Sequence, residues 1–229
     1  MPARNSRKQY LENGYYHLYN RGVEKRKIFM DRQDCSVFLS YLKEYLLPKN
    51  EKELYEKLSD KTISSKEKDK ILKLLRLNNF SEEIILLAYC LMPNHFHLFV
   101  KQKSPNSIDK FINSLCTRYT MYFNKKYKRV GSLYQGVYKA VLLDNEPQFL
   151  HLSRYIHKQA LASQGDALRS YEGQPSSYLE YIGSRKTEWI HPEEILSYFS
   201  KSNPSLSYKN FVEQNDEYES IENLILEED

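Results

Sequence analysis

Hydrophobic and polar positions along the chain predict four strands. Residues 15–22 (YYHLYNRG) alternate aromatic and polar side chains and end in a turn, which is typical of a strand. Residues 82–93 are a nearly continuous apolar run, which predicts a buried strand. A Pro-Asn pair then predicts a turn into a partner strand over 95–101. The segment YKAVLL, residues 138–143, predicts the last strand.

Apolar residues spaced three and four apart predict three helices between and after these strands. The first lies within 31–48, the second spans 106–128, and the third spans 145–162. The predicted order is strand, helix, strand, strand, helix, strand, helix. Its first six elements match an α+β, ferredoxin-like (split βαβ) antiparallel sheet with helices on one face.

Two segments lie outside this pattern. Residues 49–80 are rich in lysine and glutamate and carry a capping-box pair, Ser64 and Glu67, so they predict a charged helical insertion and not a second domain. The chain after Ser163 predicts further short helices and ends in an acidic tail. We therefore expect a main domain over 1–163 and a C-terminal extension over 164–229.

The distribution of charge is more informative than the net charge of +4. Basic residues crowd the stretch 101–139, where Asp109 is the only acid, whereas 213–229 contains acids and no lysine or arginine. A basic body with an acidic tail favours a polyanionic partner such as nucleic acid. A solvated surface with no such partner would show the same charges.

The cysteines and the apolar runs indicate in which cellular compartment the protein is expected. Cys35, Cys90 and Cys116 are odd in number and far apart, which is typical of free thiols in a reducing compartment and not of a disulfide framework or zinc knuckle. The first thirty residues lack the apolar run of a signal peptide. No stretch approaches the ~20 apolar residues of a membrane span. We expect a cytoplasmic protein that makes no use of a membrane.

Two histidines lie on the strand over 95–101. His95 and His97 are two residues apart and share one face of the strand, while Phe96 and Leu98 share the other. Two neutral imidazoles at this spacing can bind one metal ion, which needs at least one further ligand. A solvent-facing strand that uses histidine twice would give the same short pattern.

A polar column on the third helix adds two chemical groups. His151, Tyr155 and Gln159 are four residues apart and share one face of the helix. The amide oxygen of Gln159 suits Mg²⁺ or Mn²⁺, and the phenol of Tyr155 is a candidate nucleophile. A lone tyrosine is more often a packing residue, and a surface helix of mixed polarity would show the same column.

Four longer strings occur together in an order and spacing found in one family. They are YHLYNRG, LMPNHFHLFV, RYTMYFNKKYKRVGSLYQGVYKAVLL and FLHLSRYIHKQALA. On these strings the chain resembles the single-tyrosine HUH transposases, which include REP-associated tyrosine transposases and IS200-like transposases. The later strings PSSYLEYIG and EWIHPEEILSYF resemble the tail of this family, so the resemblance covers about residues 15–200.

The resemblance implies a ferredoxin-like catalytic domain over 1–163 that cuts and rejoins single-stranded DNA, at hairpin or repeat ends. Tyr155 matches the family's nucleophile, and His95, His97 and Gln159 match its divalent metal site, for Mg²⁺ or Mn²⁺. Attack by the phenol would give a 5′-phosphotyrosine and a free 3′-hydroxyl. No nucleotide cofactor is implied.

The phenol needs help to lose its proton, because its free pKa is about 10. His151 and His157 on the same helix are candidates for proton handling. The DNA strand itself needs cations for its phosphates and aromatic faces for its bases. The candidate DNA-binding residues are Asn20, Arg21, Arg26, Arg118, Lys125, Lys126, Lys128, Arg129 and Tyr134.

Several points stay open on the sequence. Many relatives carry an Asn-Pro pair where this chain reads HKQALA, and the insertion over 49–80 and the acidic tail lie outside the family pattern. One alternative function is a non-catalytic ferredoxin-like module that binds single-stranded nucleic acid. Another is a metal phosphoesterase that uses water, with Tyr155 structural. A homodimer is a further candidate, since family members occur as monomers and as dimers.

Overall fold

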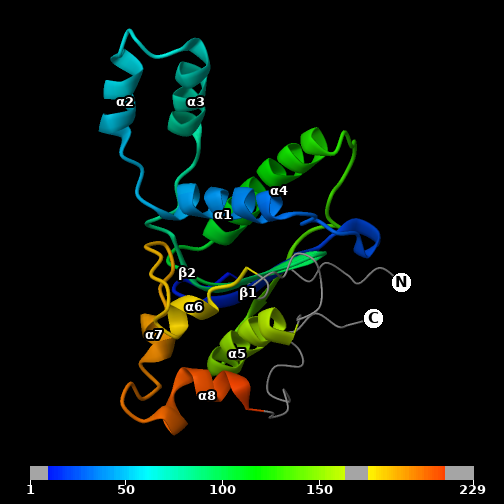
Figure 1. The fold of residues 1–229 in the computed structure, drawn as a ribbon, viewed down its shortest axis with the longest axis vertical. Helices are drawn as coiled ribbons and strands as arrows, with labels where there is room; N and C mark the ends of the chain where they lie inside the picture. Colours follow the sequence, from blue (N-terminus) through cyan, green and yellow to red (C-terminus); the bar gives the residue numbers. More distant parts are fainter. Residues whose placement is uncertain (1–9, 163–174, 215–229) are drawn as a thin grey trace.

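The computed structural model describes residues 10–162 and 175–214 and is built on a four-stranded antiparallel sheet (Figure 1). The strands are β1 (Tyr15–Arg21), β2 (Ile84–Met92), β3 (His95–Gln102) and β4 (Lys139–Leu142). They lie in the order β2-β3-β1-β4, and each neighbouring pair is antiparallel. The α+β, ferredoxin-like fold predicted from the sequence is confirmed.

Two helices cover one face of the sheet. They are α1 (Arg32–Leu46) and α4 (Ser107–Lys126). The core beneath them includes Phe38 from α1, Phe111 from α4, and Phe96 and Leu98 from β3, none of which has exposed surface. The apolar stripes predicted from three- and four-residue spacing are therefore the faces that these helices bury.

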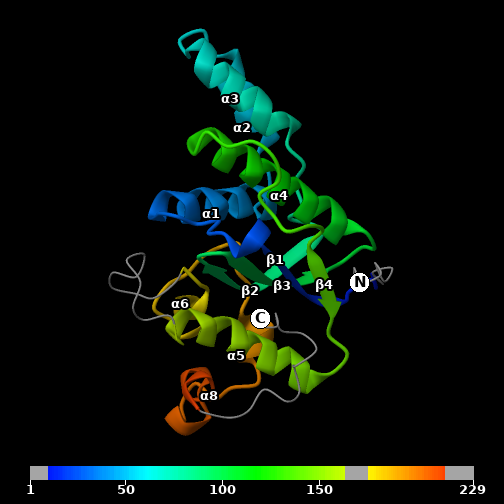
Figure 2. The same ribbon diagram turned by 90° about the vertical axis from the view of Figure 1, so that its right-hand side faces the viewer.

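A second helical layer covers the opposite face (Figure 2). It consists of α5 (Glu146–Ala162), α6 (Tyr178–Tyr181), α7 (Glu193–Leu196) and α8 (Tyr208–Glu213), with the short 3₁₀ turns η1 (Val23–Lys25) and η2 (Pro204–Leu206) elsewhere in the chain. The sequence expectation left this face of the sheet uncovered, and that detail is wrong. Ala88, Cys90 and Phe99 point to this face and are buried against Leu152 and Ile156 of α5.

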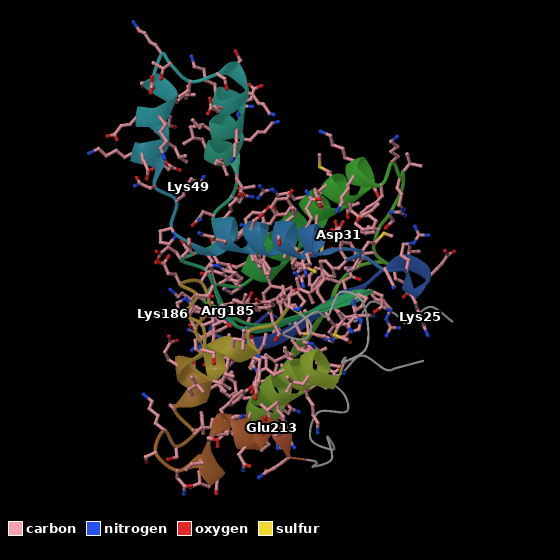
Figure 3. The ribbon with its side chains drawn as sticks, viewed as in Figure 1. Lys25, Asp31, Lys49, Arg185, Lys186 and Glu213 are labelled. Atoms are coloured by element: carbon pink, nitrogen blue, oxygen red, sulfur yellow. The ribbon has the colours of Figure 1, made fainter. Side chains whose placement is uncertain are left out.

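The charged insertion forms a helical hairpin that projects from the body (Figures 1 and 2). Its helices are α2 (Glu51–Ser59) and α3 (Ser65–Arg76), and neither has a buried residue. The predicted capping box is present, since Ser64 and Glu67 exchange side-chain and backbone hydrogen bonds. At the base of the hairpin, Lys49 Nζ donates to the carbonyl oxygens of Leu75 (2.9 Å) and Leu77 (2.7 Å) (Figure 3).

The C-terminal extension runs along the outer edge of β2. Leu91 N donates to Pro175 O at 2.9 Å, Ser177 N donates to Tyr89 O at 3.0 Å, and His191 N donates to Leu86 O at 2.9 Å. Arg185, labelled in Figure 3, pairs with the carboxylate of Glu180 within the extension. These contacts satisfy backbone groups of β2 that an edge strand would leave open.

Cys35 and Cys90 are buried, Cys116 is half-buried, and all three are free thiols, as the sequence predicts. Within the described residues, no helix has the length and apolar character needed to cross a membrane. A cytoplasmic location stays a prediction.

Candidate active site

The strand register gathers the site residues on the face of the sheet that α5 covers. His97 pairs with Tyr19 of β1, and His95 pairs with Arg21. Directly paired residues in an antiparallel sheet point to the same face, so these four side chains share it, with His17 two residues before Tyr19. The rings of His95 and His97 have centroids 4.8 Å apart and are nearly perpendicular.

Each imidazole of the pair is held through Nδ1. His95 Nδ1 lies 2.6 Å from Asn94 Oδ1, and because an amide oxygen only accepts, His95 donates there. His97 Nδ1 lies 2.9 Å from Nε2 of His17. The proton on Nδ1 of His95 leaves its Nε2 with a free lone pair. Nε2 of His97 has a free lone pair when the proton shared with His17 belongs to Nδ1 of His97.

The Nε2 atom of His97 is buried and has no hydrogen-bond partner among the residues that the structure describes. An orphaned polar atom in the interior costs free energy, so this nitrogen lacks the partner that a bound group would supply. A lone pair on a buried imidazole suits a divalent metal ion. The pair therefore fits the metal site that the family resemblance implies.

The charge state of both histidines agrees with this reading. Burial lowers the pKa of His95 to about 4, and the nearby Arg21 adds to the effect. Burial also lowers the pKa of His97 well below its usual value, with further contributions from His95, His17 and Arg21. Both rings are thus neutral at pH 7, which is the form that binds a metal ion.

Helix α5 brings Tyr155 to this pair. Tyr155 is 5 % exposed, and its ring lies 5.4 Å from that of His97 and 6.4 Å from that of His17, edge to face in both cases. The tyrosine and the histidine that sequence spacing singled out separately are therefore in contact. Gln159 is half-buried one helical turn further along α5.

The ligands available to a metal ion are few. Among the described residues, no group of three or more histidine, cysteine, aspartate or glutamate side chains is placed to hold a metal ion. A site at this position would therefore depend on two imidazoles and a ligand of another kind. The amide of Gln159 is the ligand of that kind that the sequence predicts.

His17 is the site residue that sequence reasoning missed. It is fully buried and touches both His97 and Tyr155. The alternation of YYHLYNRG places His17 on the face that β1 shares with Tyr19, which was a usable signal. Its contact with His97 could not be inferred, because that contact depends on the β1–β3 register.

The two histidines predicted to handle protons lie against the C-terminal extension. His157 is fully buried, with Nδ1 2.6 Å from Tyr208 Oη and Nε2 2.8 Å from Ser177 Oγ. Burial lowers the pKa of His157 to about 3. His151 packs against Phe211 of α8 at 5.5 Å. Proton handling by either residue stays a prediction.

Three of the predicted DNA-binding residues lie near the histidines. Arg21 pairs with His95, Asn20 Nδ2 donates to Gly136 O at 3.3 Å, and the buried Tyr134 forms a β-bridge with Gly22. The end of β1 and the loop before β4 are thus joined beside the site.

The other predicted DNA-binding residues lie elsewhere, and two are paired with acids. Lys126 bridges Asp31 (2.6 Å) and Asp34 (2.7 Å), and Asp31 is labelled in Figure 3. Arg118 pairs with Glu44 and stacks on the ring of Tyr41. Within the remaining set, Arg26 pairs with Glu24, Arg129 donates to Asn124, and two lysines at the end of α4 are exposed: Lys125 and Lys128.

Comparison with known proteins places this geometry in a family. Residues 54–159 match the family model described as "Transposase IS200 like", a segment that contains both site histidines and Tyr155 and ends at Gln159. No curated protein matches the sequence.

Two solved structures are similar. A REP-associated tyrosine transposase bound to a REP hairpin has a TM-score of 0.50 at 8 % identity and covers 82 % of this chain and 96 % of its own. A candidate transposase from Deinococcus radiodurans R1 has a TM-score of 0.28 at 16 % identity, covering 68 % of this chain and 97 % of its own, which is too distant to inform the fold.

The matched segment and the ferredoxin-like fold support a transposase, a class of DNA-processing enzyme. The family inferred from the sequence motifs is the one whose model matches residues 54–159, just under half of the chain.

Proposed function

We propose that the chain cuts and rejoins single-stranded DNA through a covalent link between the DNA and Tyr155. The observation that carries the proposal is the contact of the Tyr155 ring with His97, whose Nε2 is buried without a partner. A phenol beside neutral imidazoles on a rigid sheet has the parts that phosphodiester attack requires: a nucleophile and a site for a divalent ion.

The proposed reaction is a phosphoryl transfer. The phenolic oxygen of Tyr155 attacks the phosphorus of a phosphodiester and loses its proton, the bond to the 3′-oxygen breaks, and that oxygen takes up a proton. The products are a 5′-phosphotyrosine and a free 3′-hydroxyl. The 3′-hydroxyl of a second strand can attack the phosphotyrosine in turn, which restores the phenol and rejoins the DNA.

We assign the metal site to Nε2 of His95, Nε2 of His97 and the amide oxygen of Gln159. A bound Mg²⁺ or Mn²⁺ would neutralise the charge on a non-bridging phosphate oxygen. Asn94 accepts from Nδ1 of His95, and we assign the proton of the His97–His17 hydrogen bond to Nδ1 of His97, so that each Nε2 is free to act as a ligand.

The DNA partner is proposed to be a single strand with hairpin or repeat ends. The similar REP-associated transposase was solved with a REP hairpin, which supports this substrate class. Tyr155 contacts the histidines of its own chain. A site assembled within one chain does not need a homodimer, so dimerisation stays a separate prediction.

A denaturing gel tests the proposal. A hairpin-bearing single strand is labelled at its 3′ end, because the 3′ fragment is the part that stays on the protein. Incubation with Mn²⁺ should give a labelled band shifted by the mass of the chain. Tyr155→Phe and His97→Ala should lose this band.

Two other results would contradict the proposal. Cleavage that persists in Tyr155→Phe without a covalent band would identify the water-using phosphoesterase. Binding of the strand with neither cleavage nor a covalent band would identify the non-catalytic binding module.

A further inference from the structure

One row of side chains crosses three strands of the sheet at the level of the site. Tyr19 of β1 pairs with His97 of β3 on one side and with Lys139 of β4 on the other. Paired residues point to the same face, so Lys139, Tyr19 and His97 form a row on the face that carries Tyr155. The row leads from the buried histidine to the exposed lysine at the β4 end.

A pocket of about 310 Å³ opens at the β4 end of this row. Its walls include Tyr19 and Arg21 of β1, Gln135 and Gly136 of the preceding loop, and Lys139 of β4. This volume is at the lower end of small-ligand sites, so the pocket suits one nucleotide and not a base pair.

The lining has the chemistry of a single-strand site. Tyr19 is half-buried, and its ring is held 4.7 Å from the ring of His17 and 6.2 Å from that of His97. The charged residues of the lining are Arg21 and Lys139, both cationic. A fixed aromatic ring with cations beside it is the combination that holds a base and its phosphates.

The pocket also differs from the basic surface of α4. Lys126 and Arg118 pair with acids on α1 and at its N-cap, whereas the described residues that line this pocket include no acid. The backbone at Gly136 is open to solvent, since a Cβ added there would meet nothing within 4 Å. A strand can therefore approach this side over open backbone.

We propose that this pocket binds the nucleotide next to the scissile phosphate, with its base against Tyr19 and its phosphates against Lys139 and Arg21. The inference rests on the proposed function, because it uses the same row of residues to lead the strand to Tyr155. It adds a subsite and three residues to that function: Tyr19, Gln135, which is exposed and lines the pocket, and Lys139.

Binding can be measured apart from cleavage. The full chain carrying Tyr155→Phe is titrated into fluorescein-labelled dT20, and fluorescence anisotropy gives the affinity. Adding Tyr19→Ala should weaken binding by about 5- to 150-fold, which corresponds to the ~1–3 kcal/mol of one base stack. Tyr19→Phe should bind like the parent, because it keeps the aromatic face. Tyr55→Ala is the matched control on the exposed hairpin.

A second variant, Lys139→Gln, changes a residue outside the histidine cluster. Lys139→Gln should reduce the slope of log affinity against log salt by about 0.7, the value for one phosphate contact with a single strand. Lys201→Gln, an exposed lysine of the extension, should leave the slope unchanged.

Three outcomes overturn the subsite. They are parental affinity in Tyr19→Ala, equally weak binding in Tyr19→Phe, and an unchanged salt slope in Lys139→Gln. If Tyr19→Ala lowers the melting temperature, its affinity no longer tests the subsite. The salt dependence of binding by Lys139→Gln then decides whether the subsite exists. Failure of the parent to bind dT20 overturns the subsite alone, because the covalent band on the hairpin strand tests the proposed function separately.

Discussion

His17 and Asn94 decide which nitrogen of each site histidine stays free. Asn94 accepts from Nδ1 of His95, and we assign His17 the acceptor role towards Nδ1 of His97, whose Nε2 is buried with no hydrogen-bond partner among the described residues. Partners of this kind fix the orientation of a ligating ring and raise its basicity. We therefore predict a positioning role for His17 in the proposed site.

His17→Leu tests this role. Loss of the acceptor should lower the affinity of the full chain for Mn²⁺ by roughly 10- to 100-fold in a calorimetric titration. His17→Gln places an amide oxygen near the position of Nε2 and should recover most of the loss. Equal affinity for Mn²⁺ in the leucine variant and the unmodified chain would show that His17 only fills space.

His157 makes stability depend on pH. Its folded pKa of about 3 lies below the unfolded value of about 6.5, so between these values the unfolded chain binds a proton that the folded chain does not. Its contribution to stability is therefore complete above about pH 6.5 and is lost as the pH falls towards 3. The steepest loss from this one residue is about 1.4 kcal/mol per pH unit.

Urea denaturation at a series of pH values checks this prediction. The free energy of unfolding of His157→Gln should fall less steeply between about pH 6.5 and 5 than that of the unmodified chain. The exposed His191→Gln should keep the full slope. An identical slope in His157→Gln would remove His157 as the cause.

At the scale of elements, the α2–α3 hairpin is separate from the core. No residue of either helix is buried, and the hairpin meets the body at Lys49 and Asn79, whose side chains donate to nearby carbonyls. Changes to exposed surface usually alter stability by less than about 0.5 kcal/mol per residue. We therefore expect the sheet and its core to fold without the hairpin.

Replacing residues 51–76 by a short glycine–serine linker tests this independence. The free energy of unfolding should change by less than about 1 kcal/mol, and the covalent band should persist. Phe80→Ala, in the core beside the hairpin, should cost about 3–5 kcal/mol and serves as the contrast. A comparable loss on removal of the hairpin would show that it supports the body.

Periodicity predicted the elements and the main site residues because the information is local. His95 and His97 share a face by the two-residue period of a strand, and Tyr155 and Gln159 by the four-residue period of a helix. The capping box at Ser64 is equally local. These features need no knowledge of how distant segments meet.

Features that depend on pairing between distant segments were not predicted. The contact of His17 with His97 needs the β1–β3 register, and the pairing of Lys126 with Asp31 and Asp34 needs the packing of α4 on α1. The second helical layer had a sequence signal, since the continuous apolar run of β2 is typical of a strand buried on both faces.

At the scale of the whole molecule, the sheet lies between two helical layers, and the two sides differ in the residues they hold. α1 and α4 cover one apolar core, and Arg118 and Lys126 of α4 are paired with acids. The α5 side holds the histidines, the tyrosine and the pocket. The candidate site residues thus lie on the α5 side, and both faces of the sheet carry a buried apolar cluster.

The extension that follows residue 163 seals the β2 edge through Pro175, Ser177 and His191. An unsealed edge strand offers its backbone groups to any other chain and invites aggregation. A gene truncated after α5 would therefore encode a protein whose β2 edge is exposed and prone to aggregation. Every proposed catalytic residue would still be present. Truncation of the gene from its 3′ end would therefore remove the protection against aggregation before it removed any proposed catalytic residue.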